Sequence, residues 1–284
     1  MYFRVTFVKL IMLQFSTIFS ITECSNILKE PLRILGGNDA NPDEYPYVVR
    51  IELKFWTIST NNTTVAENYH LCTGSALSST WVLTAAHCLV SWLQSFKVKF
   101  VIRYGKGFDP QRTNHFFSDV LHTIKHPLYR NNENDIGLMQ VTPMRIANYM
   151  KISAVDYLSI LGHEADIAGF GVTTLNLPGV KIETNDTLVL RKPLQVLKVL
   201  IYKCPEHYFT NSYCLARRCG HRVTACGGDS GGPLIHTSGI AGILTLGEKT
   251  ADCLDHVAKK STNVAGIALP ISWYIEWIYS HVSY

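Results

Sequence analysis

Short β-rich segments, separated by clusters of turn residues, fill most of the chain between residues 34 and 261. Four segments rich in β-branched and aromatic residues span 45–53, 96–104, 188–202 and 239–247. Gly, Pro, Asn and Asp punctuate them, which is typical of antiparallel strands joined by hairpin-like connections. The sequence shows neither the strand–helix alternation that a parallel sheet needs nor an internal repeat. We therefore predict an all-β fold.

The C-terminal segment follows a different pattern. Residues 271–284 contain no Gly or Pro, and Tyr274, Trp277, Ile278 and His281 recur at helical spacing. This predicts one amphipathic C-terminal α-helix packed on the β body. No change in composition marks a linker within 34–284, so we expect one domain over that range.

Composition excludes several classes of protein. With 284 residues, 47% of them hydrophobic and 17% charged, the chain is neither collagen, low-complexity disorder nor a multi-span membrane protein. The formal net charge is only +4, an excess too small to indicate nucleic acid or an anionic membrane as a partner.

An apolar run near the N-terminus indicates export. Two basic residues precede residues 10–21, which would rise only about 18 Å as a helix, against a hydrocarbon core of about 30 Å. This predicts a secretory signal peptide over 1–24 rather than a membrane anchor. Cleavage after Cys24 and cleavage after Ser20 both fit the residues there. We expect a secreted, extracellular protein.

Export changes how the cysteines are interpreted. In an oxidising compartment the eight cysteines are expected to form disulfides rather than to ligate metal. There is no C-x-x-C pair, and the 11 histidines show no zinc-type spacing, so we expect no metal site. Glycosylation sequons at Asn61, Asn62 and Asn185 agree with export to the cell exterior.

Three short strings carry the candidate chemistry: WVLTAAHC with His87, NDIGLMQV with Asp135, and ACGGDSGGPL with Ser230. Taken singly, each has a structural explanation, as a core histidine, a turn aspartate and a glycine-rich turn. Together they supply the groups that activate a serine hydroxyl as a nucleophile. An imidazole takes the hydroxyl proton, and a buried carboxylate fixes the imidazole tautomer. The glycines around Ser230 leave the backbone N–H groups of Gly228 and Ser230 free to bind a tetrahedral oxyanion.

With TAAHC and GDSGGP in this order, residues 34–284 resemble the chymotrypsin/trypsin-family serine endopeptidases. The resemblance implies two six-stranded antiparallel β-barrels with the active site between them. It also implies peptide hydrolysis through His87, Asp135 and Ser230 by way of an acyl-enzyme intermediate.

The N-terminal end of this domain resembles the family's activation junction. Cleavage after Arg33 would remove a short propeptide, residues 25–33, and free the ammonium group of Ile34. By analogy, this ammonium pairs with the carboxylate of Asp229 and orders the oxyanion loop. An arginine followed by a turn is the alternative, which Gly36 and Gly37 support equally.

The resemblance also implies disulfide pairings. Cys72–Cys88, Cys204–Cys214 and Cys226–Cys253 match bridges found in the family. Cys219 is left over, as is Cys24 unless it leaves with the signal peptide, and whether these two pair with each other stays open.

For specificity, the resemblance places Thr224 at the base of the primary pocket and Gly247 and Gly266 on its walls. Such a neutral, open pocket suits a large apolar or aromatic residue on the acyl side of the cut. The enzyme could then not cut after Arg33 itself, so another trypsin-like protease must activate it. The segments on either side of Cys253 are longer than usual and carry five charged residues that either reach the pocket or lie on its solvated rim: Glu248, Asp252, Asp255, Lys259 and Lys260.

Other expectations concern neighbouring residues and rival functions. By analogy the hydroxyl of Thr245 could reach the Asp135 carboxylate. Lys106 occupies about the place of the first carboxylate of the family's calcium loop, so we expect no calcium and no cofactor.

The rival hypothesis is a catalytically silent homologue that acts as a binding scaffold. A lipase or esterase is disfavoured because Ser230 comes last in the triad order within an all-β chain.

We expect a protein or peptide as substrate. An activating trypsin-like protease and a protein inhibitor such as a serpin are the other expected partners, and the protein itself is expected to be a monomer.

Overall fold

The computed structural model describes residues 34, 37–41, 43–58, 64–90, 98–105, 116–130, 133–171, 193–205, 211–217, 224–247 and 264–282. Several predictions fall on residues outside these ranges. They concern Cys24, Arg33, Asn61, Asn62, Lys106, Asn185, residues 188–192, Cys219, Cys253 and the five charged residues around Cys253.

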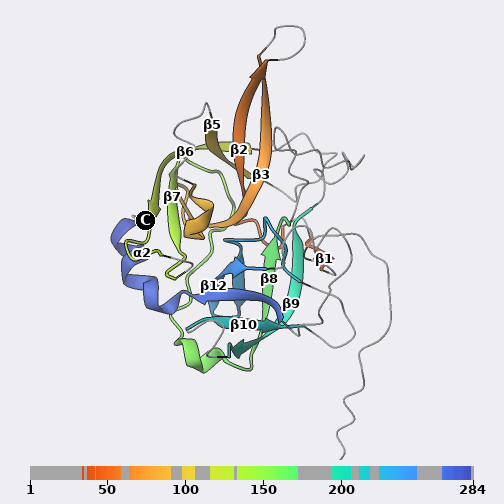
Figure 1. Ribbon diagram of the computed structural model, residues 1–284, viewed down its shortest axis with the longest axis vertical. Helices are drawn as coiled ribbons and strands as arrows, with labels where there is room; N and C mark the ends of the chain where they lie inside the picture. Colours follow the sequence, from red (N-terminus) through yellow and green to blue (C-terminus); the bar gives the residue numbers. More distant parts are fainter. Residues whose placement is uncertain are drawn as a thin grey trace, which may run out of the picture.

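Six antiparallel strands close the first β-barrel, in the spatial order β2-β3-β4-β7-β6-β5. Their bounds are β2 Val48–Ile58, β3 Thr64–Ala76, β4 Trp81–Thr84, β5 Val98–Tyr104, β6 Phe116–Lys125 and β7 Gly137–Val141. Strands β2 and β3 stay paired as far as Ile58 and Thr64, and Figure 1 shows this hairpin extending well beyond the rest of the barrel. Of the expected segment 45–53, residues 48–53 form the first part of this longer strand, and residues 45–47 form a turn before it.

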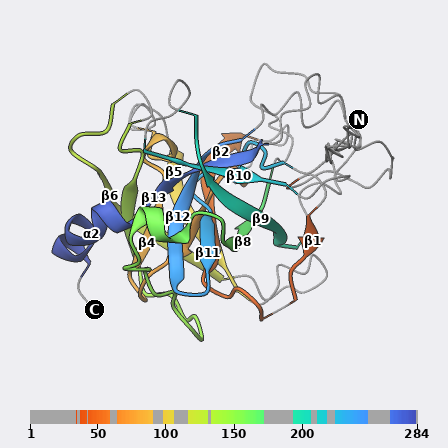
Figure 2. The same ribbon diagram turned by 90° about the horizontal axis from the view of Figure 1, so that it is seen from below.

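A second barrel follows in the chain, with the order β9-β10-β13-β12-β11-β8 closed by pairing of β8 with β9. Its strands are β8 Glu164–Gly169, β9 Gln195–Lys203, β10 Tyr213–Ala216, β11 Pro233–His236, β12 Gly239–Leu246 and β13 Val264–Pro270. A short strand β1, Asn38–Asp39, pairs with the first two residues of β9, Gln195 and Val196. The prediction of two six-stranded antiparallel barrels is confirmed, and Figures 1 and 2 show them packed against each other.

The C-terminal helix is shorter than the sequence predicted. A 3-10 turn covers Ser272–Tyr274, and only Ile275–His281 form α-helix α2. Ile278 is fully buried, in a cluster that also contains Leu138 of the first barrel and Ile243 of the second. The helix therefore contributes apolar side chains to the junction of the two barrels. Within the residues described by the structure, no helix has both the length and the apolar character needed to cross a bilayer.

Candidate active site

His87 and Asp135 come together because their strands are neighbours in the first barrel. Strand β4 pairs with β7, with Thr84 opposite Gly137. His87 lies in the 3-10 turn Ala86–Cys88 just after β4, and Asp135 lies just before β7. The backbone N–H of His87 donates to Asp135 Oδ1 at 2.8 Å, and ring Nδ1 lies 2.7 Å from Asp135 Oδ2. These two bonds fix the ring relative to the carboxylate.

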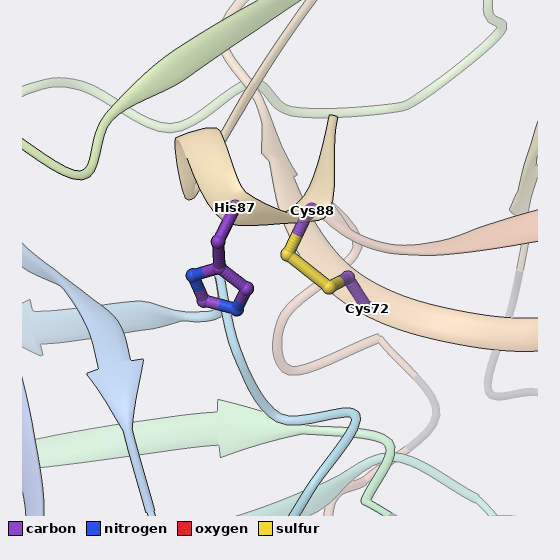
Figure 3. A group of neighbouring side chains, drawn as sticks. All are labelled: Cys72, His87 and Cys88. Carbon is purple, nitrogen blue, oxygen red and sulfur yellow. A yellow bond between two sulfur atoms is a disulfide. The ribbon is translucent and has the colours of Figure 1, made fainter. Parts of the chain in front are cut away.

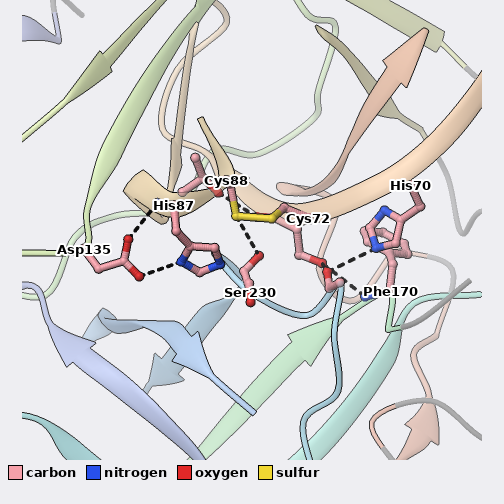
Figure 4. The surroundings of a disulfide bond; sticks show 10 residues. His70, Cys72, His87, Cys88, Asp135, Phe170 and Ser230 are labelled. Carbon is pink, nitrogen blue, oxygen red and sulfur yellow. Dashed lines mark hydrogen bonds and ion pairs between the residues drawn. A yellow bond between two sulfur atoms is a disulfide. The ribbon is translucent and has the colours of Figure 1, made fainter. Parts of the chain in front are cut away.

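The side chains of Asp135 and His87 differ in burial, and this difference favours proton transfer through the His87 ring. The Asp135 side chain is 1% exposed, whereas the His87 side chain is 32% exposed. A buried carboxylate accepts from Nδ1–H, so the ring presents the lone pair of Nε2 on its other side. Figure 4 shows Ser230 on that other side, with the His87 ring between Ser230 and Asp135.

Ser230 reaches this place from the second barrel, in the loop that precedes β11. Its carbonyl oxygen accepts a hydrogen bond of 2.9 Å from the backbone N–H of Thr73 on β3. The Sγ atom of Cys88 lies 3.8 Å from the same oxygen. The nucleophile loop is thus hydrogen-bonded to the first barrel at strand β3, and it packs against the turn that also carries His87.

A disulfide between Cys72 and Cys88 ties β3 to the turn of His87, as Figure 3 shows. His87 and the two cysteines have their ligand atoms within 4.8 Å of one another. The sulfurs are bonded to each other, however, so neither is a thiolate and the trio is not a metal site. A second disulfide joins Cys204 and Cys214. Both were expected from the resemblance.

The loop before Ser230 requires glycine at position 228. Gly228 has φ of +90°, and a Cβ there would lie 2.9 Å from the Nε2 atom of His70. The Gly228 carbonyl accepts from Thr73 Oγ1 at 2.8 Å and lies 3.1 Å from His70 Nε2. Among the described residues, none accepts a hydrogen bond from the backbone N–H of Gly228 or Ser230. Glycine at 228 thus lets the loop pass close to His70 and Thr73.

Asp229 anchors the loop from inside the protein. Its side chain is fully buried. Oδ1 accepts a 2.6 Å bond from the backbone N–H of Gly171, and Oδ2 accepts a 2.9 Å bond from that of Cys226. Ile34 is also fully buried, within the core cluster of the second barrel. Cys226 is itself disulfide-bonded, and its expected partner Cys253 lies outside the described residues.

Comparison with known proteins agrees with this geometry. The family model described as Trypsin matches residues 34–278. The chain belongs to the trypsin family. It is a serine-type endopeptidase by this membership.

Individual trypsin-family relatives match along nearly their whole length. The chain is 30% identical over 261 residues to granzyme M of Rattus norvegicus, covering 85% of this chain and 87% of the relative. It is 27% identical to trypsin-3 of Salmo salar, covering 93% and 99%. Among solved structures, it resembles mouse brain neuropsin, a serine protease, with a TM-score of 0.59 at 22% identity, covering 87% of this chain and 98% of that one.

The three expected pocket positions of this trypsin-family chain meet around Ala225. A Cβ at Gly247 would lie 2.7 Å from the carbonyl carbon of Ala225, and a Cβ at Gly266 would lie 3.3 Å from its Cβ. The hydroxyl of Thr224 is within bonding distance of the carbonyl oxygens of Ala265 (3.2 Å) and Ala225 (3.3 Å). Thr224 thus contributes a buried, uncharged side chain beside Ala225.

One expected contact does not form. The hydroxyl of Thr245 donates to the carbonyl oxygen of Ile267 at 3.4 Å rather than reaching the Asp135 carboxylate. Strand β12 pairs with β13 with a register shift between Leu244, which lies opposite Ala268, and Leu246, which lies opposite Ile267. Thr245 lies at this shift, and its hydroxyl is directed to the carbonyl of Ile267.

Sequence reasoning missed a second support of Asp135. Asn134 has φ of +51°, and its Oδ1 accepts a 2.9 Å hydrogen bond from the hydroxyl of Tyr274. Burial, together with the charge of Asp135, raises the pKa of Tyr274 to about 12, so the hydroxyl keeps its proton at physiological pH. The tolerance of asparagine for positive φ was the only local signal. The C-terminal segment thus holds the residue next to Asp135.

Proposed function

We propose that this enzyme cleaves peptide bonds through a Ser230 acyl-enzyme, with His87 as general base and acid. The observation that carries the proposal is the 2.7 Å contact between His87 Nδ1 and Asp135 Oδ2, with Ser230 on the far side of the ring. Asp135 keeps the proton on Nδ1 and stabilises the imidazolium as it forms.

The proposed steps follow from this arrangement. His87 Nε2 takes the proton of the Ser230 hydroxyl as Oγ attacks the substrate carbonyl carbon. The N–H groups of Gly228 and Ser230 donate to the oxyanion, and one such donor is worth about 3–4 kcal/mol of barrier. The imidazolium then protonates the leaving nitrogen, the C–N bond breaks, and water activated by His87 hydrolyses the ester.

We propose that the protein is secreted as a zymogen. Residues 1–24 would be the signal peptide and 25–33 the propeptide. Cleavage after Arg33 would free the ammonium of Ile34 to pair with Asp229. The full burial of Ile34 and Asp229 in the second barrel supports this pairing. Removing one member of a buried ion pair costs about 3–5 kcal/mol of stability, which is enough to disorder the oxyanion loop.

The Arg33→Gln variant tests activation. We expect it to stay inactive after treatment with a trypsin-like protease, because that protease requires a basic residue before the cut. Arg33→Lys is the matched control, which should be cut and become active. Full peptidase activity from uncut Arg33→Gln protein would contradict the zymogen proposal.

For specificity, we propose a preference for large apolar or aromatic residues on the acyl side of the cut. Thr224 supports this, since it has no charge to pair with Arg or Lys and its hydroxyl already contacts backbone carbonyls. Anilide substrates that end in Phe or Leu should be hydrolysed faster than one that ends in Arg. The reverse order would overturn the assignment.

The remaining proposals concern partners and modification. The family implies protein substrates, and we propose an activating trypsin-like protease, a serpin-like inhibitor and a monomeric enzyme. Asn61, Asn62 and Asn185 are proposed glycosylation sites on the secreted protein. Mass spectrometry of the secreted protein, before and after removal of N-linked glycans, tests these three positions.

A further inference from the structure

Two histidines far apart in the sequence lie side by side on the second barrel. His236 is the last residue of β11, and His163 precedes the neighbouring strand β8. The Nδ1 atom of His163 is 3.1 Å from the Nε2 atom of His236, and the ring centroids are 5.3 Å apart. Because 73 residues separate them, no local spacing in the sequence could reveal the pair.

The His236 ring is held by a chain of hydroxyls. Its Nδ1 atom lies 2.7 Å from Ser238 Oγ and 3.3 Å from the backbone nitrogen of Ser238. Ser238 Oγ is in turn 2.6 Å from Oγ of Ser153, which is buried. The backbone N–H of Ser238 donates to Nδ1, so without metal the ring proton lies on Nε2 and is shared with Nδ1 of His163. Metal binding at Nε2 moves this proton to Nδ1, where Ser238 Oγ accepts it. Orientation of a ligand histidine by a group on its other nitrogen is typical of metal sites.

The distance between the two nitrogens suits a shared metal ion. With metal–nitrogen bonds of 2.0–2.1 Å, nitrogens 3.1 Å apart subtend an angle of about 100° at the metal. That angle lies between the octahedral and tetrahedral values. His163 is exposed, so water can complete the coordination. Imidazole nitrogen is a ligand preferred by late divalent transition metals.

We propose that His163 and His236 bind one divalent transition-metal ion of the Zn²⁺ and Cu²⁺ class. The ion joins the start of β8 to the end of β11. Strand β8 leads to Gly171, whose N–H holds Asp229, and β11 follows directly on the Ser230 loop. A ligand that binds only the folded state stabilises it by mass action, so the ion stabilises the framework under this loop.

Zinc binding to the full chain tests the proposal, with Ser230→Ala as background to prevent self-cleavage. Calorimetric titration with ZnCl₂ should show an equivalent of zinc that is lost in His163→Asn and in His236→Asn. A hundredfold excess over Kd should raise the melting temperature by about 5–10 °C, and this rise should be lost in both variants. X-ray absorption at the zinc edge should show two imidazole nitrogens at about 2.0–2.1 Å.

Two control variants separate this site from others. His122 lies exposed on β6 of the first barrel, so His122→Asn should keep the zinc equivalent and the melting shift. His87→Ala should keep them as well. Zinc binding that persists in both His163→Asn and His236→Asn would overturn the proposal. So would a Kd weaker than about 1 mM, which would mean that the two rings form a hydrogen-bonded pair only.

Discussion

The anchoring of Asp229 can be tested by adding one methyl group. A Cβ at Gly169 would overlap Oδ1 of Asp229 and lie 2.9 Å from its Cγ, where ordinary contact begins at 3.4 Å. Gly169 ends strand β8 without a positive φ, so alanine fits the backbone and the collision falls on the carboxylate. The Gly169→Ala change therefore acts on Asp229 through its side chain.

The size of the effect follows from the two hydrogen bonds that the displaced carboxylate would weaken. Relief of the overlap requires the carboxylate to retreat by at least about 0.5 Å, away from the N–H groups of Gly171 and Cys226. A hydrogen bond to a charged group is worth about 1.5–3 kcal/mol, so loss of one or both costs roughly 1.5–6 kcal/mol. Asp229 lies between Gly228 and Ser230, so the oxyanion donors move with it. We expect kcat/KM to fall about a hundredfold, near 2.7 kcal/mol.

The assay is kcat/KM of the Arg33-cleaved enzyme, with burst titration to count active sites. Gly242→Ala is the matched control: it lies in β12 of the same barrel, and its Cβ would lie 2.9 Å from the carbonyl oxygen of Leu269, away from Asp229. We expect this control to lower the melting temperature yet keep activity per folded molecule. Wild-type kcat/KM in folded Gly169→Ala protein would refute the role given to Asp229.

Two further substitutions test the pocket and the support of Asp135. Thr224→Asp should raise the ratio of Arg to Phe anilide hydrolysis by at least about tenfold, a difference of about 1.4 kcal/mol, and an unchanged ratio would place the pocket base elsewhere. Tyr274→Phe removes the bond to Asn134, worth about 0.5–1.5 kcal/mol, and should lower the melting temperature by about 1–6 °C and kcat by up to about tenfold. A lower melting temperature with unchanged kcat would give that bond a purely structural role.

The architecture was predictable where the signal is local. Segment 239–247 forms β12, Gly239–Leu246, almost as predicted. Its strand signal, a short apolar run bounded by glycines, lies within the segment itself. The strings around His87, Asp135 and Ser230 are also local. Only the family resemblance predicted that these three strings meet in the fold, because spacing along the chain does not determine which strands pair.

Contacts between distant side chains could not be predicted in this way. The bond from Tyr274 to Asn134 and the contact of His163 with His236 join residues far apart in sequence, and neither partner carries a local pattern that points to the other. The expected approach of Thr245 to Asp135 was wrong for a related reason. A register shift in β12 decides which neighbour a side chain meets, and the sequence does not encode that shift locally.

The most direct test is covalent labelling with an organophosphonate that reacts only with an activated serine. Arg33-cleaved protein should take up the label at Ser230, as identified by peptide mass mapping, and lose peptidase activity in step with uptake. His87→Ala protein should resist labelling although its serine is intact. Peptidase activity that survives without label on Ser230, or equal labelling of His87→Ala, would contradict catalysis by this serine.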